Sequence, residues 1–212
     1  VWIIPTQNPD GRVVFEGDAP APTPNPGSQP IVCQPASFTT GPVGLNRIAL
    51  VIHSDWSFEI PGLAWFGGLR VTPPAGWALA RVRHEGRDIT DTPIDFQSGD
   101  VGGLEVVLTN RVGTVSGTVT SGGQPAVKAG ILVMGADDTS WAYMSRTMTS
   151  VRTDDRGTFT IGGLVPGRYL AVAASADMQT LDRASLLTLR SLGVPFTVSE
   201  RTNTAVTIML AK

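Results

Sequence analysis

Short stretches in which apolar and polar residues alternate recur along the whole chain and predict β-strands. The clearest one places Phe159 and Ile161 on one face and threonines on the other. An Asp-Asp-Arg-Gly turn at residues 154–157 precedes it, because Gly tolerates a positive φ and Asp can bond to its own turn. A Pro-Gly turn at residues 166–167 leads into a second strand that carries Tyr169. We predict that these two strands form a hairpin.

An earlier segment repeats this pattern. When residues 54–63 are aligned with the later strand, Phe58 and Ile60 fall on Phe159 and Ile161. Two further segments match at their apolar positions, namely Leu104, Val106 and Leu108 with Val206, Ile208 and Leu210. The sequence therefore repeats with a period of about 100 residues, as expected of two β-domains in tandem.

The repeat divides the chain into three parts. Residues 1–10 are an N-terminal segment, residues 11–110 a first β-sandwich and residues 111–212 a second. A chain of 212 residues is long enough for two such domains. The proline-rich stretch at residues 18–30 is stiff and extended, and we expect it to be a loop of the first domain.

Both domains are expected to consist of short strands, and one helix is predicted. The clearest strands are expected at residues 12–16, 31–33, 48–52, 130–134, 196–198 and 206–210. The helix is expected at residues 181–192, where leucines recur and Gly193 and Pro195 end the element. The sequence thus predicts an all-β protein with one short helix in its second domain.

Composition narrows the range of partners. The net charge is −2 and the sequence has no basic run, so no nucleic-acid partner is expected. No apolar stretch reaches the roughly 18 residues that a membrane helix needs, so no membrane span is expected. Cys33 is the only cysteine, which excludes an intrachain disulfide.

Val1, Trp2, Ile3 and Ile4 form an apolar, β-prone segment ahead of a turn at residues 8–11. In one interpretation this segment is the last strand or linker of an upstream domain of the same protein. In the other, it pairs as a strand with a neighbouring copy of the chain. The first residues lack the cationic start of a signal peptide, so we expect a mature product or the later part of a longer protein.

Three motifs of the second domain occur in a characteristic order. They are Val-Ser-Gly-Thr-Val at 115–119, Thr-Asp-Asp-Arg-Gly-Thr-Phe-Thr-Ile at 153–161 and Gly-Leu-Val-Pro-Gly-Arg-Tyr at 163–169. This order resembles the carboxypeptidase regulatory-like domain, which has a transthyretin-like fold. The first domain looks like a diverged copy, in which Pro61 replaces a turn Gly and Trp65-Phe66 stands where Val-Pro is expected.

The resemblance implies a fold and a setting. It implies two consecutive Greek-key β-sandwiches of the transthyretin or immunoglobulin-like kind. Such domains are appended to enzymes, receptors and surface proteins and are generally non-catalytic. The resemblance implies that this chain belongs to a bacterial secreted or surface protein with an extracellular or cell-surface location. Fold alone does not define function, so the residues must be examined for chemistry.

Few residues have the spacing of a reactive site. His53-Ser54-Asp55 contains the residues of a catalytic triad, but neighbours on a strand point to opposite faces and cannot form a relay. Asp88 and Asp91 do not have the spacing of a calcium loop and are expected to bond backbone amides in turns. We therefore predict no catalytic residues, no metal site and no cofactor.

Aromatic residues are the remaining candidates for a binding surface. Trp65 and Phe66 lie at a predicted turn tip, and Trp141 and Tyr143 lie in the loop before the Phe159 strand. Exposed aromatic rings could stack on sugars or contact a partner, whereas buried ones would fill the sandwich.

The sequence favours a non-catalytic extracellular structural module that assembles with copies of itself through strand pairing, as in a surface filament or appendage. The alternative is a carbohydrate-binding or adhesion module whose partner is a polysaccharide. A hydrolase is the least favoured of the three functions.

Overall fold

The computed structural model describes residues 9–24, 32–36, 48–49, 51–60, 66–92, 94–95, 101–141, 145–174 and 183–210. These residues form two compact units, described separately below, that divide between Asn110 and Arg111. Strands dominate both units, and the predicted all-β class is confirmed.

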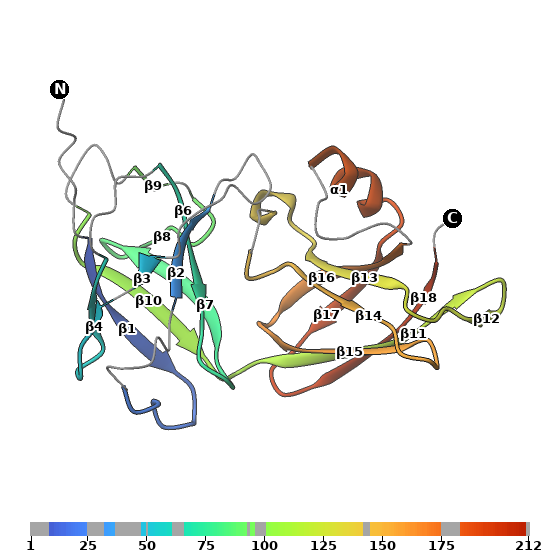
Figure 1. Cartoon of the computed structure of the whole chain (residues 1–212), viewed down its shortest axis with the longest axis horizontal. Helices are drawn as coiled ribbons and strands as arrows, with labels where there is room; N and C mark the ends of the chain where they lie inside the picture. The colour runs from blue at the N-terminus through green and yellow to red at the C-terminus, as the bar shows by residue number, and fades with distance from the viewer. Residues whose placement is uncertain are drawn as a thin grey trace. The chain divides into compact units, whose positions relative to one another are not determined.

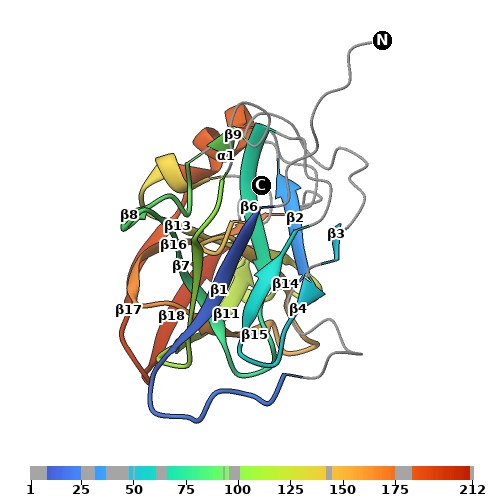
Figure 2. The ribbon, with the colours of Figure 1, turned by 90° about the vertical axis from the view of Figure 1, so that its left-hand side faces the viewer.

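The first unit is a sandwich of two sheets (Figures 1 and 2). One sheet has the order β4 (Val51–Ile52), β5 (Ser57–Glu59), β1 (Asp10–Glu16), β10 (Leu104–Thr109), β7 (Ala78–His84) and β8 (Arg87–Asp88). The other has the order β3 (Ile48–Ala49), β2 (Val32–Ala36), β6 (Phe66–Thr72) and β9 (Ile94–Asp95). Alternate residues of β10 and the predicted pair Phe58 and Ile60 are buried in the core between the sheets.

The single strand predicted at residues 48–52 is wrong. Ile48–Ala49 pairs with β2 in one sheet, whereas Val51–Ile52 pairs with β5 in the other. The segment therefore changes sheet between Ala49 and Val51. A continuous apolar run has no alternation that would assign it to one layer, so the sequence did not show this change.

The second unit is also a sandwich, and it carries the helix (Figure 1). In one sheet β11 (Gly113–Ser121) lies between β15 (Thr158–Leu164) and β18 (Asn203–Met209), and β12 (Gln124–Pro125) pairs with the end of β11. The other sheet has the order β14 (Thr149–Arg152), β13 (Gly130–Gly135), β16 (Gly167–Ala174) and β17 (Val194–Val198). A 3-10 turn, η1 (Asp138–Ser140), and α1 (Arg183–Arg190) complete the described part.

Strand β13 is buried along its whole length because both of its faces are covered. Ile131 and Val133 face the core of the sandwich. Leu132 and Met134 lie on the other face, in a separate cluster with Leu186 of α1. The helix forms inside the predicted range of residues 181–192, and this covering role explains Leu186 and Leu189, whereas Leu187 is exposed.

The predicted hairpin does not form. β15 pairs with β11 in one sheet, and β16 pairs with β13 and β17 in the other. Both strands must bury an apolar face in the same core, and placing them in opposite layers lets Phe159 and Tyr169 enter that core from two sides. The connection at residues 165–166 therefore crosses between layers.

Tyr169 anchors this crossing. Its side chain is 2% exposed, and its hydroxyl donates a 2.8 Å hydrogen bond to the carbonyl oxygen of Val165, four residues earlier. The same arrangement, a buried Tyr bonding the backbone just upstream, marks the corners of many β-sandwiches. Burial raises the pKa of Tyr169 to about 12, because the phenolate would lose its hydration.

This pKa predicts a loss of stability at high pH. The folded-state pKa lies above the unfolded value of 10.0, so the contribution of Tyr169 is complete below pH 10.0 and is lost as the pH rises towards about 12. The loss should reach about 2–3 kcal/mol. In Tyr169→Phe this part of the pH dependence should disappear, and the variant should be about 1–2 kcal/mol less stable at neutral pH. Urea unfolding at several pH values measures the free energy of unfolding of both proteins. An equally steep decrease of this free energy with alkaline pH in the wild type and in Tyr169→Phe would contradict the prediction.

The sequence repeat corresponds to a repeated arrangement of three strands. In the first unit β1 pairs antiparallel with β5 and parallel with β10, and in the second β11 pairs in the same way with β15 and β18. Gly11 pairs with Phe58 and Leu104, and Gly117 pairs with Phe159 and Val206. The apolar positions matched in the sequence therefore occupy equivalent places.

The strand that follows β6 in the first unit and the strand that follows β16 in the second unit join different sheets. In the first unit that strand is β7, which joins the sheet of β10 and pairs with it antiparallel. In the second unit it is β17, which joins the other sheet and pairs with β16. As a result β10 has neighbours on both sides, whereas within the described residues β18 pairs only with β11.

Candidate functional site

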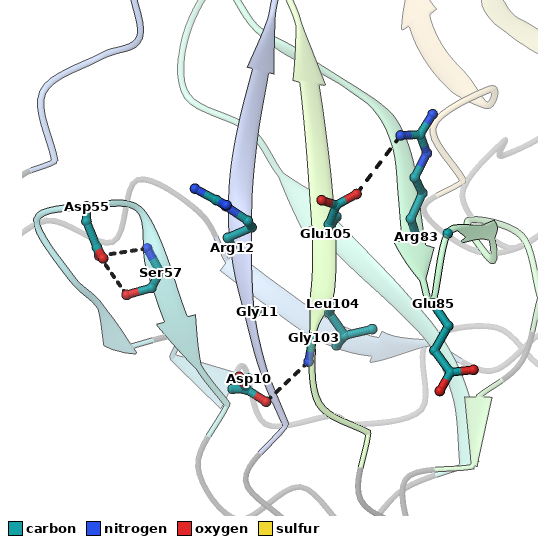
Figure 3. A pocket seen from close by; sticks show the side chains of 11 residues that line it. Asp10, Gly11, Arg12, Asp55, Ser57, Arg83, Glu85, Gly103, Leu104 and Glu105 are labelled. Atoms are coloured by element: carbon teal, nitrogen blue, oxygen red, sulfur yellow. Dashed lines mark hydrogen bonds and ion pairs between the residues drawn. The ribbon is translucent and has the colours of Figure 1, made fainter.

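A polar groove of about 640 Å³ lies over the outer face of the six-stranded sheet of the first unit (Figure 3). Four neighbouring strands place Ser57, Arg12, Glu105 and Arg83 in one row across the sheet, each paired in register with the next. The row exists because these residues occupy the outward positions of strands whose alternate side chains form the core. Asp10, Asp55 and the turn after β7 complete the rim; the full lining is Asp10, Gly11, Arg12, Asp55, Ser57, Arg83, Glu85, Gly86, Gly103, Leu104 and Glu105.

The charged groups of the groove interact weakly. Arg83 Nη1 lies 4.0 Å from Glu105 Oε2, and both side chains are about two-fifths exposed, so this pair contributes little to stability. Asp10 Oδ1 accepts a hydrogen bond of 3.3 Å from the Gly103 amide (Figure 3). The lining contains no aromatic side chain, so the groove has no platform on which a sugar ring could stack.

The His53-Ser54-Asp55 segment forms a turn. The Trp56 amide donates to the His53 carbonyl, and Asp55 Oδ1 accepts bonds from the Ser57 hydroxyl at 2.6 Å and the Ser57 amide at 3.0 Å. These bonds lower the pKa of Asp55, the hydroxyl contributing most. His53 Nε2 lies 3.9 Å from Glu59, an exposed ion pair when the imidazole is protonated. The segment is therefore a turn that the Asp55 side chain stabilises by bonding Ser57, two residues later.

The other acidic residues singled out in the sequence also serve turns. Asp88 accepts hydrogen bonds from the amide and hydroxyl of Thr90, which confirms its predicted role. Asp154 accepts from the hydroxyl and amide of Thr158 and from the Arg156 amide, and these bonds, the Thr158 hydroxyl first, lower the pKa of Asp154. Among the described residues, no three His, Cys, Asp or Glu side chains come together as metal ligands would.

Most of the predicted contact residues lie outside the described part of the chain. These are Val1, Trp2, Ile3, Ile4, Trp65 and Tyr143. Phe66 begins β6, but its side chain does not belong to the described part of the structure.

Trp141, one of the candidate contact aromatics, is buried. Its side chain is only 3% exposed and packs with Leu132 and Met134 on the outer face of β13. The indole nitrogen donates a 2.7 Å hydrogen bond to the Gly135 carbonyl, and the Arg190 guanidinium lies 5.8 Å from the ring centroid. The polar end of the ring finds a partner beside an apolar cluster, so burial is favourable.

Among the described residues, no strand pairs with the side of β18 that faces away from β11, and the sequence did not show this open edge. Strand β18 is seven residues long and contains no charged residue, proline or glycine. Charges, prolines, bulges and short strands are the usual features that protect sheet edges from pairing with another chain. The edge strand β17 contains Pro195, whereas β4 and β8 have two residues each. The alternation of residues 206–210 was visible in the sequence, but its position at an edge was not.

Comparison with known proteins gives structural likenesses only. No family model and no curated protein match the chain. The Bacillus anthracis TIE protein is 13% identical with a TM-score of 0.32, over 96% of this chain and 33% of its own. The shaft pilin SpaA from Lactobacillus rhamnosus GG is 10% identical with a TM-score of 0.33, over 97% and 99% of the two chains. GBS52, the minor pilin of Streptococcus agalactiae, is 10% identical with a TM-score of 0.35, over 95% and 94%.

These values do not define a family or a function for this chain. The chain spans only a third of the length of the TIE protein chain. None of the helices in the described residues has the length and apolar character needed to span a bilayer.

Proposed function

We propose that this chain is a non-catalytic structural module of the cell surface or extracellular space that associates with copies of itself through strand pairing. Residues Val1, Trp2, Ile3 and Ile4 are the strand that one molecule offers to its neighbour. The observation that carries this proposal is the uncharged edge of β18, which no strand in the described part of the chain covers, because unpaired backbone groups at such an edge bind an added strand.

The turn roles of the acidic residues agree with a structural module. Asp55, Asp88 and Asp154 each bond the backbone and a hydroxyl of their own turn. Their carboxylates are thereby held in place as parts of the fold. We further propose that both units are of the carboxypeptidase regulatory-like kind, on the strength of the three motifs at residues 115–169.

Light scattering of the purified full chain tests the proposed function. The wild-type chain should form oligomers or filaments, and deletion of residues 1–6 should leave monomers. Ile3→Asp should weaken assembly because it places a charge in an apolar strand, whereas Ile3→Val should assemble normally because it keeps an apolar, β-branched side chain. A wild-type chain that stays monomeric, or assembly that survives the deletion, would show that the proposal is wrong.

A further inference from the structure

We infer that the edge of β18 turned away from β11 is the acceptor site, and that it binds residues 1–4 of a second copy of this chain as an added antiparallel strand. The inference rests on the proposed self-association and names the surface that receives the strand.

The backbone of β18 has its free groups on one side. In a parallel pair, alternate residues direct both their N–H and C=O groups to the partner strand. The Leu210 amide donates to the Thr120 carbonyl at 2.9 Å, and the Thr202 carbonyl accepts from the Thr114 amide at 2.9 Å. Even-numbered residues of β18 thus bond to β11. The N–H and C=O groups of the odd-numbered residues, Asn203, Ala205, Thr207 and Met209, point to the open edge.

The first unit shows how this edge can be covered. β10 is the equivalent of β18, and its outer edge is paired antiparallel with β7 over residues Glu105–Thr109. Because Leu104 corresponds to Val206, a strand placed like β7 would pair with β18 from Thr207 onwards. The second unit lacks this strand within the described residues, since β17 lies in the other sheet. The fold therefore has a known solution for this position, and a second molecule can supply it.

The chemistry of the edge selects an uncharged partner. In the first unit Glu105 of β10 faces Arg83 of β7. At the equivalent position of β18 stands Thr207, and the side chain of Met209 at the end of the strand is 81% exposed. Because no residue of β18 is charged, a charged strand would form no ion pair with it, whereas Val-Trp-Ile-Ile would extend the apolar face and pair well with a β-branched neighbour.

The other long edge of this sheet is a weaker acceptor. β15 is also seven residues long and has an open side within the described residues. It contains Gly162 and Gly163, which weaken a strand, and its pairing with β11 shifts register between Gly113 and Val115. β15 therefore supplies a control for strand addition at β18.

Two proline variants separate the edges. Thr207→Pro removes an N–H that points to the open edge of β18 and leaves the hydrogen bonds to β11 in place. Thr160→Pro makes the same change on β15, where the Val119 amide bonds to the Gly157 carbonyl and the amides of even-numbered residues therefore point outward. In light scattering of the full chain, Thr207→Pro should abolish oligomers, whereas Thr160→Pro and the isosteric Thr207→Val should keep them. Oligomers that persist in Thr207→Pro, or that are lost only in Thr160→Pro, would overturn the β18 assignment without excluding self-association through another edge.

Hydrogen exchange of the unmodified chain keeps the test valid if Thr207→Pro does not fold. The Thr207 and Met209 amides, which face the open edge where the added strand would pair, should exchange at least about tenfold more slowly in the assembled full chain than in the chain lacking residues 1–6. The amides of β13, which are already bonded on both sides, serve as the internal reference. Assembly without added protection of β18 would refute the acceptor site alone, and a wild-type chain that remains monomeric would refute the proposed function together with it.

Discussion

Replacing Trp141 with alanine should lower the free energy of unfolding of the second unit by about 3–5 kcal/mol. The indole is 3% exposed and fills the cluster between the outer face of β13 and Leu186 of α1. Alanine would leave a cavity there and would leave the Gly135 carbonyl without the indole N–H that now bonds to it at 2.7 Å. Urea unfolding of the full chain, with the transition of the second unit followed by circular dichroism, measures the loss.

Two controls separate packing from other effects of this substitution. Trp141→Phe keeps much of the ring volume and loses the hydrogen bond, so its cost should be clearly smaller than that of alanine. Leu192→Ala removes a side chain that is 51% exposed and should change stability by no more than about 0.5 kcal/mol. If Trp141→Ala cost less than about 1 kcal/mol, the buried position of this ring would be incorrect.

Adding a single methyl group at Gly117 should destabilise the second unit by about 3 kcal/mol. A Cβ there would overlap the Val206 carbonyl oxygen of the parallel strand β18 and lie 2.8 Å from the Phe159 ring. The carbonyl belongs to the paired backbone and cannot move without disturbing the hydrogen bonds between β11 and β18. The clash in Gly117→Ala therefore cannot be relieved by a small shift. The equivalent Gly11 meets the Leu104 carbonyl and the Phe58 ring in the same way.

Gly162→Ala is the matched control for Gly117→Ala. Its Cβ would meet nothing nearer than the Thr114 hydroxyl at 3.6 Å. Alanine should therefore be neutral or stabilise by up to about 1 kcal/mol, because it restricts the unfolded chain. In thermal unfolding, the midpoint of Gly117→Ala should lie well below that of the wild-type chain. The midpoint of Gly162→Ala should equal or exceed the wild-type value. Equal losses would contradict the close approach of backbone at Gly117.

Trp141 shows why a candidate binding residue can be a core residue. In the sequence Trp141 stands among polar residues in a predicted loop, and no apolar pattern around it predicts that its ring is buried. The structure covers the outer face of β13 with α1, which creates a second apolar cluster outside the sandwich. A short helix about 45 residues further along the chain thus decides the environment of the ring.

Local sequence patterns alone determined several strands, the helix and the Asp-containing turns of this protein. Alternation at Phe159 and Ile161, and its repeat at Phe58 and Ile60, predicted strands whose side chains are buried in two separate cores. The leucines before Gly193 predicted the helix, and the Asp-containing turns were predicted from the ability of Asp to bond its own backbone. These features depend on neighbours within a few residues, and so the sequence carries them directly.

The tertiary structure alone decided which strands are neighbours. The two strands around the Pro-Gly turn lie in opposite sheets, and β7 and β17 follow equivalent strands yet join different layers. An apolar face can be buried in the same core from either layer, so alternation does not choose between them. The polar row over the first unit and the open edge of β18 both result from these pairings, because an edge is defined by the strand that is not beside it.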